Sequence, residues 1–239
     1  MPTSITKHIP NLITCSNLFS GCIACVMAFE GKYTLALGFI ILGAIFDFFD
    51  GFFARLLQAY SPIGKELDSL ADDISFGLAP AIIVFTFLRE PDLSYPIFLL
   101  DIKTRLPYLA FLIAVFSALR LAKFNVDTRQ TDSFIGLPTP ANALFWSSFI
   151  AGSKELLLTY TNVIYILVLV FIFSGLLVME IPMFSLKFKS FTWKENKIRY
   201  LFLLVCIPLI FLFKLSGVAA VILWYIILSL LTQRKRNLA

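Results

Sequence analysis

The sequence has few of the side chains that most often bind transition metals or carry out redox chemistry. It contains one histidine, His8, and four cysteines in 239 residues. Cys22 and Cys25 have the spacing of a zinc or redox motif, but they lie in an apolar run without enough partner ligands. We therefore expect both cysteines to pack as small residues in a membrane helix. A lone histidine beside the first apolar run is expected to be an interfacial residue rather than a catalyst.

Charged residues are also scarce, since they make up only 15% of the chain. Hydrophobic residues make up 59%, and the mean hydropathy is +0.87, so no extended water-soluble domain is expected. Apolar runs of about 20 residues can cross a bilayer as helices, and they predict an all-α, polytopic membrane helical bundle of about eight transmembrane helices. The short fifth run and the tight break before the eighth leave six or seven crossings possible. The predicted spans are residues 12–29, 34–54, 66–88, 104–124, 139–153, 161–180, 199–213 and 216–232.

Lysine and arginine are distributed unevenly between the two sides of this predicted bundle. With an even number of crossings, both termini and the loop between Arg55 and Lys65 share one side, which carries most of the positive charge. The positive-inside rule makes that side cytoplasmic. We therefore expect a multi-pass protein of the cell (inner) membrane, with both termini and the loop in the cytoplasm. This topology and attraction to lipid explain the net charge of +5. Nucleic acid is not expected as a partner, because no basic stripe is interleaved with polar readout residues.

One segment holds a concentration of acid in a regular frame, D-x2-D-G-x2-A-R-x8-G-x3-D-x3-D. On a helix, Asp47 and Asp50 are i, i+3 neighbours, and Asp68 and Asp72 are i, i+4 neighbours. Each pair therefore projects from one face. A turn over residues 62–64 is expected to let two helices run antiparallel and bring the two pairs together.

These four acids require cations. An aspartate at the centre of a membrane helix costs about 2.5 to 3.5 kcal/mol on insertion scales, and carboxylates in contact oppose each other's ionisation. Pairing with Arg55 and Lys65 would leave at least two acids unpaired. Two hard divalent ions with oxygen ligands would balance four carboxylates. Asp73 points about 100° away from Asp72 on a helix, so we expect it either to support the metal ligands without binding an ion or to have a structural role.

Polar residues on two other predicted helices could face the same site. Asn11, Thr14 and Asn17 form a stripe that either bonds a neighbouring helix or faces a polar cavity. Thr139 precedes a proline, which is typical of a helix N-cap and first turn, and the free N–H groups there would suit an anion. Arg120 lies on the same predicted side, where it either binds an anion or reaches lipid headgroups.

Paired divalent ions between carboxylates, with an arginine beside them, are suited to displacement at phosphorus. Such ions bridge phosphate oxygens, neutralise developing charge and align the nucleophile with the leaving group. A carboxylate not fully used by metal can accept the proton of an attacking hydroxyl. At a membrane surface, the simplest substrate is a lipid phosphate or diphosphate.

The frame from Asp47 to Asp72 resembles the signature of the CDP-alcohol phosphatidyltransferase family at every fixed position. The segments 68–80, 120–125 and 136–140 are similar to the branch that uses serine as acceptor, and the motifs together cover residues 10–142. The resemblance implies a six-helix core over residues 1–180, with additional C-terminal transmembrane helices in residues 181–239. It also implies transfer of a phosphatidyl group from CDP-diacylglycerol to the hydroxyl of L-serine, giving phosphatidylserine and CMP.

The resemblance also implies a role for each residue of the frame. Two divalent ions, Mg²⁺ or Mn²⁺, would be bound, the first by Asp47, Asp50 and Asp68 and the second by Asp47, Asp68 and Asp72, and Asp72 would be the base toward serine. Homodimers are typical of the family. The expected substrate contacts are Gly51 and Ala54 with cytidine, Arg55 with the diphosphate, Gly64 in the turn, and Asn11 and Thr14 with the nucleotide. We further hypothesise that Arg120 and the helix start at Thr139 receive the serine carboxylate.

Three other functions fit this sequence less well. Glycerol 3-phosphate or inositol phosphate as acceptor would call for a denser basic cluster than Arg120, Lys123 and Arg129. An ion transporter also places acids in a membrane, but it predicts acids scattered over several helices and internal symmetry, whereas the sequence has no visible repeat. A membrane scaffold would leave the carboxylates unexplained.

Overall fold

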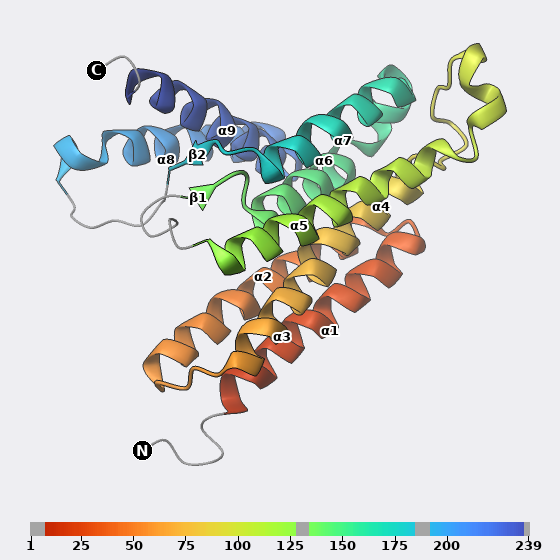
Figure 1. The fold of residues 1–239 in the computed structure, drawn as a ribbon. Helices are drawn as coiled ribbons and strands as arrows, with labels where there is room; N and C mark the ends of the chain where they lie inside the picture. The colour runs from red at the N-terminus through yellow and green to blue at the C-terminus, as the bar shows by residue number, and fades with distance from the viewer. Residues whose placement is uncertain (1–7, 128–133, 185–191, 237–239) are drawn as a thin grey trace.

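The computed structural model describes residues 8–127, 134–184 and 192–236, and Arg129 lies outside them. The described residues are almost entirely helical, which confirms the all-α prediction (Figure 1). The α-helices are α1 (Ile9–Phe29), α2 (Tyr33–Leu56), α3 (Pro62–Asp72), α4 (Ala79–Phe87), α5 (Leu112–Val126), α6 (Thr139–Tyr160), α7 (Val163–Val178), α8 (Trp193–Phe213) and α9 (Ser216–Arg236).

Several of these helices are suited to a bilayer, so the prediction of a polytopic membrane bundle is confirmed. Two shorter apolar helices, Val163–Val178 and Ser216–Thr232, accompany five segments that are long and apolar enough to cross. Those five are Ile9–Phe29, Tyr33–Leu56, Pro62–Phe87, Leu106–Val126 and Asn196–Phe213. Because α6 is long enough but is not in either group, the exact number of crossings stays a prediction.

Helix α6 corresponds to the short fifth span, and it extends to Tyr160 rather than ending near residue 153. It packs against α2, α4 and α9 in the interior of the protein. Its buried side chains include Asn142, Ser147 and Ser148, and the two serine hydroxyls bond to backbone carbonyls one turn earlier. Because protein rather than lipid surrounds it, this helix can carry polar groups that lower its apolar signal.

Two predicted spans differ from the structure in their backbone. The third span is continuous, but a π-helical segment, Asp73–Leu78, separates α3 from α4. This wide turn lies directly before Pro80, which lacks an N–H group and cannot continue regular helical bonding. In the fourth span, residues Leu106–Phe111 form a 3-10 helix around Pro107, so the α-helix begins only at Leu112.

A short pair of strands was not predicted. Strand β1 (Phe134–Ile135) pairs antiparallel with β2 (Pro182–Met183), with Phe134 opposite Met183. Gly136 follows β1 with a φ of 77°, and its N–H donates to the Ile181 carbonyl at 2.9 Å. The pair lies beside the C-terminal ends of α5 and α7 (Figure 1).

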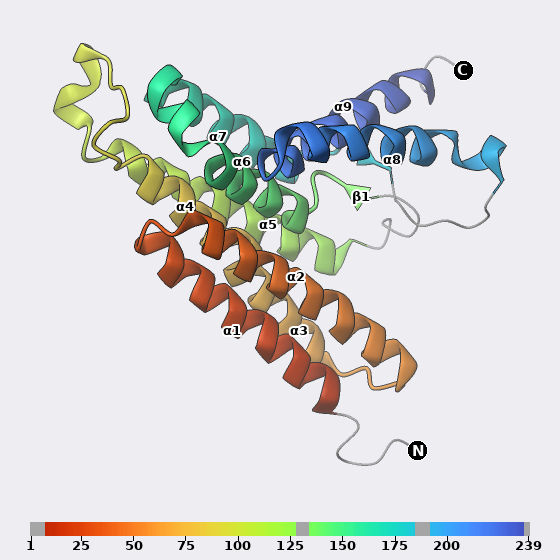
Figure 2. The same cartoon turned by 180° about the vertical axis from the view of Figure 1, so that it is seen from behind.

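The helices fall into two groups in space. Helices α1, α2 and α3 lie side by side, while α8 and α9 lie across the far side of α6 (Figures 1 and 2). One buried core joins them, because Cys206 and Tyr225 of the last two helices belong to the same cluster as Phe76 and Trp146. The predicted division at residue 180 therefore coincides with no break in the core, and it stays a prediction.

One end of the bundle gathers the segments that matter for function. Helix α1 begins, α2 ends, α3 begins and α9 ends at the left side of Figure 1. This arrangement agrees with both termini and the loop between the aspartate pairs lying on one side. Which side of a membrane that is stays a prediction.

Candidate active site

The connection between α2 and α3 turns the chain before residue 62. Gln58 has a φ of 52°, and Ser61 caps α3, because its Oγ accepts a hydrogen bond from the Gly64 N–H at 2.9 Å. Pro62 occupies the first turn of α3, where a missing N–H costs nothing. The prediction of a turn over residues 62–64 was therefore wrong, since those residues begin the helix and the turn precedes them.

Gly64 permits close packing rather than shaping a turn. A Cβ atom at this position would lie 2.9 Å from Asn11 Oδ1 and 3.0 Å from Ser61 Oγ. Helix α1 therefore approaches the start of α3 at a distance that only glycine allows without adjustment. Gly64 thus lies at the predicted site, and a glycine is needed there because α1 packs closely against α3.

Three acids of the frame come together across α2 and α3. One carboxylate oxygen from each of Asp47, Asp50 and Asp68 lies within 4.8 Å of the other two. Asp50 is 6% exposed, and Asp68 Oδ1 is buried without a hydrogen-bond partner. Oxygens at this spacing suit a hard divalent cation such as Mg²⁺ or Mn²⁺. The three acids predicted to bind the first ion therefore lie close enough together to hold one, and their role as its ligands stays a prediction.

Thr14 connects α1 to this cluster. Its hydroxyl lies 2.7 Å from Asp50 Oδ2 and 3.0 Å from the Pro10 carbonyl. Because the side chain has a single proton, it donates to one of these acceptors at a time. The two alternatives for the polar stripe on α1 both apply, since Thr14 bonds a neighbouring helix and also lines a cavity.

Asp72 lies one turn further along α3 and has a different partner. The Asn17 side chain is fully buried, and its Nδ2 donates to Asp72 Oδ1 at 3.1 Å. The backbone carbonyl of Asn17 accepts a hydrogen bond from Ser75 Oγ at 3.0 Å. Sequence reasoning placed Asn17 on the polar stripe but gave it no function. Asn17 follows Thr14 by three residues, so both share one face of α1, and this spacing could have indicated that Asn17 faces the acids.

Asp73 points elsewhere, as the helical angle predicted. Its Oδ1 is buried without a hydrogen-bond partner, and it lies beside Gly77, where a Cβ would be 2.6 Å from it. The same Cβ would be 3.0 Å from Ser117 of α5. Asp73 therefore faces the contact between the π-helical segment and α5 rather than the three-acid cluster.

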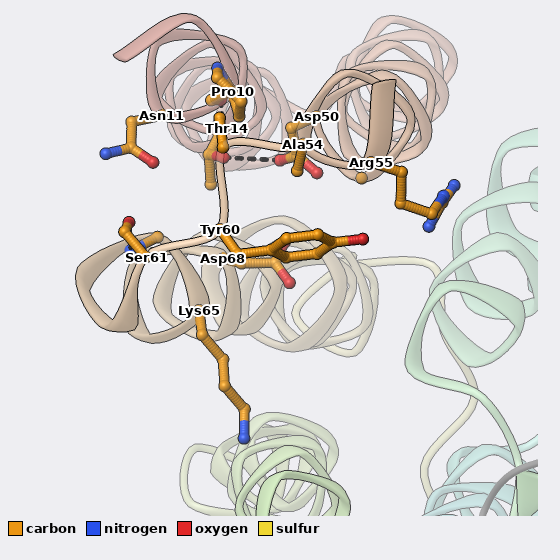
Figure 3. A pocket seen from close by; sticks show the side chains of 13 residues that line it. Pro10, Asn11, Thr14, Asp50, Ala54, Arg55, Tyr60, Ser61, Lys65 and Asp68 are labelled. Carbon is orange, nitrogen blue, oxygen red and sulfur yellow. Dashed lines mark hydrogen bonds between the residues drawn. The ribbon is translucent and has the colours of Figure 1, made fainter. Parts of the chain in front are cut away.

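A cavity of about 210 Å³ opens beside the acids, at the end of the bundle where α1, α2 and α3 meet (Figure 3). Eight predicted site residues line it: Asn11, Thr14, Asp50, Gly51, Ala54, Arg55, Gly64 and Asp68. Sequence reasoning missed Pro10, Ala59, Tyr60, Ser61 and Lys65, which complete the lining. The connection between the helices supplies Ala59, Tyr60 and Ser61, and loops carry little sequence pattern.

Two basic residues border this cavity in different ways. The Arg55 side chain extends from α2 away from Asp50 and Thr14 (Figure 3), and a Cβ at Gly51 would lie 3.5 Å from its Nη1. Lys65 points toward α5 and donates to the Asn125 carbonyl at 2.9 Å. Asn125 also donates to Ser69 Oγ at 2.7 Å. These bonds fix the end of α5 against α3.

Arg120 lies away from the large cavity, at the C-terminal part of α5. Its side chain is only 7% exposed, so it does not reach toward lipid headgroups. The guanidinium carbon is 5.8 Å from the centre of the Phe124 ring, and Nε has no hydrogen-bond partner. Arg120 lines a second, smaller cavity with Lys123, Phe124, Asp127, Ile135, Leu177, Val178 and Glu180.

Thr139 does not act as the predicted N-cap. It is the first residue of α6, and Pro138, with φ −60° and ψ 137°, holds the cap position. Because proline fixes an extended approach to the helix, the threonine is displaced into the first turn. Its hydroxyl is buried without a hydrogen-bond partner, and the side chain lines neither of the two cavities described above.

Comparison with known proteins places this geometry in context. Over 146 residues, 60% of this chain, it is 35% identical to a CDP-diacylglycerol–serine O-phosphatidyltransferase of Helicobacter pylori, and the match covers 57% of that protein. A protein of the same name from Bacillus subtilis is 35% identical over 134 residues, 56% of this chain and 70% of that protein. An archaetidylserine synthase of Methanothermobacter thermautotrophicus is 35% identical over 143 residues, 59% of this chain and 57% of that protein.

The matched segment thus spans little more than half the length of the Helicobacter pylori relative. The family model for CDP-alcohol phosphatidyltransferases matches nearly the whole of this chain, over residues 7–232. That range includes both cavities and all four acids of the frame. The chain belongs to the CDP-alcohol phosphatidyltransferase family.

Proposed function

We propose that this protein transfers a phosphatidyl group from CDP-diacylglycerol to the hydroxyl of L-serine, giving phosphatidylserine and CMP. The observation that carries the proposal is the convergence of Asp47, Asp50 and Asp68 beside a cavity that polar and charged side chains help to line, at one end of an apolar bundle. Lipid substrates can enter from the bilayer, and the water-soluble acceptor can enter from the aqueous end. The membrane orientation expected from the positive charges puts this end in the cytoplasm.

Divalent ions are part of the proposal. Asp47, Asp50 and Asp68 would hold one Mg²⁺ or Mn²⁺ ion, and Asp47, Asp68 and Asp72 would hold a second. When bound, such ions neutralise the diphosphate and the charge that develops on its oxygens during displacement. The buried, unpartnered Oδ1 of Asp68 supports this assignment, because an isolated buried carboxylate oxygen needs a compensating charge or donor.

The large cavity suits the nucleotide end of CDP-diacylglycerol. Gly51 and Ala54 have small side chains, so they leave space on the α2 side of the cavity. Asn11 and Thr14 supply polar groups from α1. Arg55 places a permanent positive charge at the edge, where it can meet the diphosphate. Gly64 contributes by letting α1 and α3 approach each other.

The chemical step requires a proton acceptor near the acceptor hydroxyl. The serine oxygen forms a bond to the lipid-bearing phosphorus, and the bond from that phosphorus to the oxygen of CMP breaks. The hydroxyl proton passes to the Asp72 carboxylate, which Asn17 orients. Asp72→Asn is therefore expected to abolish turnover while retaining binding of the nucleotide.

Serine is supported as the acceptor by the relatives, whose names include serine transferases and an archaetidylserine synthase. A phosphate-bearing acceptor such as glycerol 3-phosphate or inositol phosphate remains the second candidate within the same chemistry. The small cavity argues against it, because Asp127 and Glu180 line it together with the cations Arg120 and Lys123. A transporter is disfavoured, because the three acids meet on adjacent helices at one end.

One experiment separates these acceptors. Purified protein is supplied with CDP-diacylglycerol, Mg²⁺ or Mn²⁺, and serine, glycerol 3-phosphate or inositol phosphate in turn, and CMP release is measured. We expect CMP with serine only, and a lipid product that carries the amino acid. CMP release with a phosphate acceptor alone would replace serine by that acceptor. Gel filtration or cross-linking in the same detergent tests the homodimer, which we also propose.

A further inference from the structure

The small cavity beside Arg120 lies at the same end of the molecule as the acids. It is bounded by the C-terminal ends of α5 and α7 and by Ile135 of β1. The Leu137 N–H donates to the Leu176 carbonyl in α7, and the Gly136 N–H donates to the Ile181 carbonyl just after it. These bonds hold the end of β1 against α7. Three separate parts of the chain therefore line the cavity.

Arg120 is a buried cation directed into this cavity. Its side chain is more than nine-tenths buried, and its Nε has no hydrogen-bond partner. Burying a guanidinium is costly unless anions and acceptors compensate it. The arrangement suits a carboxylate, which can accept two parallel hydrogen bonds from one guanidinium.

The opposite charge lies across the same cavity. Asp127 follows the end of α5 and Glu180 follows the end of α7, and both line the cavity with Arg120 and Lys123. A ligand with only negative charge, such as a phosphate monoester, would meet two carboxylates here. An amino acid carries a carboxylate and an ammonium group on one carbon, so it can satisfy charges of both signs at short range.

We infer that this cavity is the binding site for a zwitterionic amino acid acceptor, with Arg120 on its carboxylate and Asp127 and Glu180 on its ammonium group. The inference rests on the proposed function, and it adds the two acids as the residues that select an amino acid over other alcohols. The cavity is small, about 30 Å³, the volume of about one water molecule, so an amino acid can enter only when lining side chains move. Lys123 and Glu180 have exposed side chains that can move to admit it.

The position of this cavity also connects it with the chemistry. Asn125, near the same end of α5, donates to Ser69 Oγ of α3, so the cavity lies beside the helix that carries Asp72. An amino acid held by its carboxylate at Arg120 and by its ammonium group at the acids has one group left free. That group is the side-chain hydroxyl, which is the nucleophile of the proposed transfer.

The test compares charge-neutral variants with matched controls. Glu180→Gln, Asp127→Asn and the double variant remove the proposed ammonium contacts with little change in shape. Glu155→Gln and Asp92→Asn change exposed acids outside both cavities. For each protein, CMP release is measured against serine and against CDP-diacylglycerol. Glycerate, which has a hydroxyl in place of the ammonium group, is the second acceptor.

We expect the double variant to raise the KM for serine by at least about tenfold, the loss of about 1.4 kcal/mol of binding free energy. The KM for CDP-diacylglycerol should stay within about twofold, which would show that the protein is folded and that the nucleotide site is intact. The controls should match the unchanged protein. The preference for serine over glycerate should fall in the double variant.

Two results would overturn the inference, and they are distinguishable. If the unchanged protein uses serine and the double variant keeps its serine KM and its preference over glycerate, the acids do not bind the ammonium group, while the proposed function stands. If the unchanged protein releases CMP only with glycerol 3-phosphate or inositol phosphate, both the proposed function and this inference fail.

Discussion

The Asn17 amide ties α1 to the acid that we assign as the proton acceptor. A carboxylate can accept a proton efficiently only when it is held in line with the reacting hydroxyl. Asn17 is fully buried and bonds Asp72 directly. Gly43 makes room for it, because a Cβ there would lie 2.9 Å from Asn17 Oδ1. A neutral amide can orient a carboxylate without neutralising its charge.

Replacement of Asn17 by alanine should therefore slow the chemical step. We expect Asn17→Ala to lower kcat by about tenfold to a hundredfold, because a small misplacement of a reacting group has effects of that size. Both KM values should change little. The Ser75 bond to the Asn17 backbone remains, so the helix contact is kept. Cys15→Ala, at an exposed neighbouring position, is the control. An unchanged kcat would remove Asn17 from the mechanism.

Arg120 gives a second prediction for a single side chain. Because its guanidinium lines the small cavity and not the large one, Arg120→Ala should raise the KM for serine and leave the KM for CDP-diacylglycerol unchanged. Arg120→Lys keeps the charge but loses the planar pair of donors. Its serine KM should therefore lie between those of the unchanged protein and Arg120→Ala. A rise in the CDP-diacylglycerol KM alone would instead assign Arg120 to the nucleotide site.

At the scale of elements, the approach of α1 to α3 decides whether the acids meet. Gly64→Ala would add a Cβ 2.9 Å from Asn11 Oδ1, and overpacking of this kind costs about 1 to 3 kcal/mol. We expect a lower melting temperature and a higher KM for CDP-diacylglycerol. Gly38→Ala is the matched control on α2, because no atom lies within 4 Å of its added Cβ.

The control variant should be neutral or more stable, since alanine in a helix is favoured over glycine by about 0.5 to 1 kcal/mol. Thermal unfolding in detergent and the kinetic assay measure both effects on the same samples. Equal changes in Gly64→Ala and Gly38→Ala would contradict a specific contact between α1 and α3.

The elements also divide into those that sequence reasoning could predict and those that it could not. Apolar runs located the helices, because a bilayer demands long hydrophobic segments. Helical spacing paired Asp47 with Asp50 and Asp68 with Asp72, since residues three and four apart share a face, and an expected antiparallel turn brought the pairs together. The π-helical segment and β1 could not be read in this way, because packing against other parts of the chain sets them. The same limit hid Tyr60, a cavity residue supplied by a connection.

For the whole molecule, the three-acid cluster predicts that stability depends on divalent ions. An ion that binds only the folded protein stabilises it by about 2.7 kcal/mol at a hundred times its Kd. Chelation should therefore lower the melting temperature and abolish CMP release, and added Mg²⁺ or Mn²⁺ should restore both. In Asp68→Asn the melting temperature should respond less to the ions. An equal response in that variant would place the ions elsewhere.

The direction in which the bundle sits in the membrane can be tested on the same fold. The cavity end carries exposed Glu66 near the start of α3, and the opposite end carries exposed Asp101. We expect Asp101→Cys to react with a membrane-impermeant maleimide in intact cells and Glu66→Cys to react only after permeabilisation, both in a background without the four native cysteines. This outcome places the acids on the cytoplasmic side, where cytidine nucleotides are made and where CMP can return to that pool. The reverse labelling would invert the topology, and the proposed reaction would then lack a supply of its nucleotide substrate.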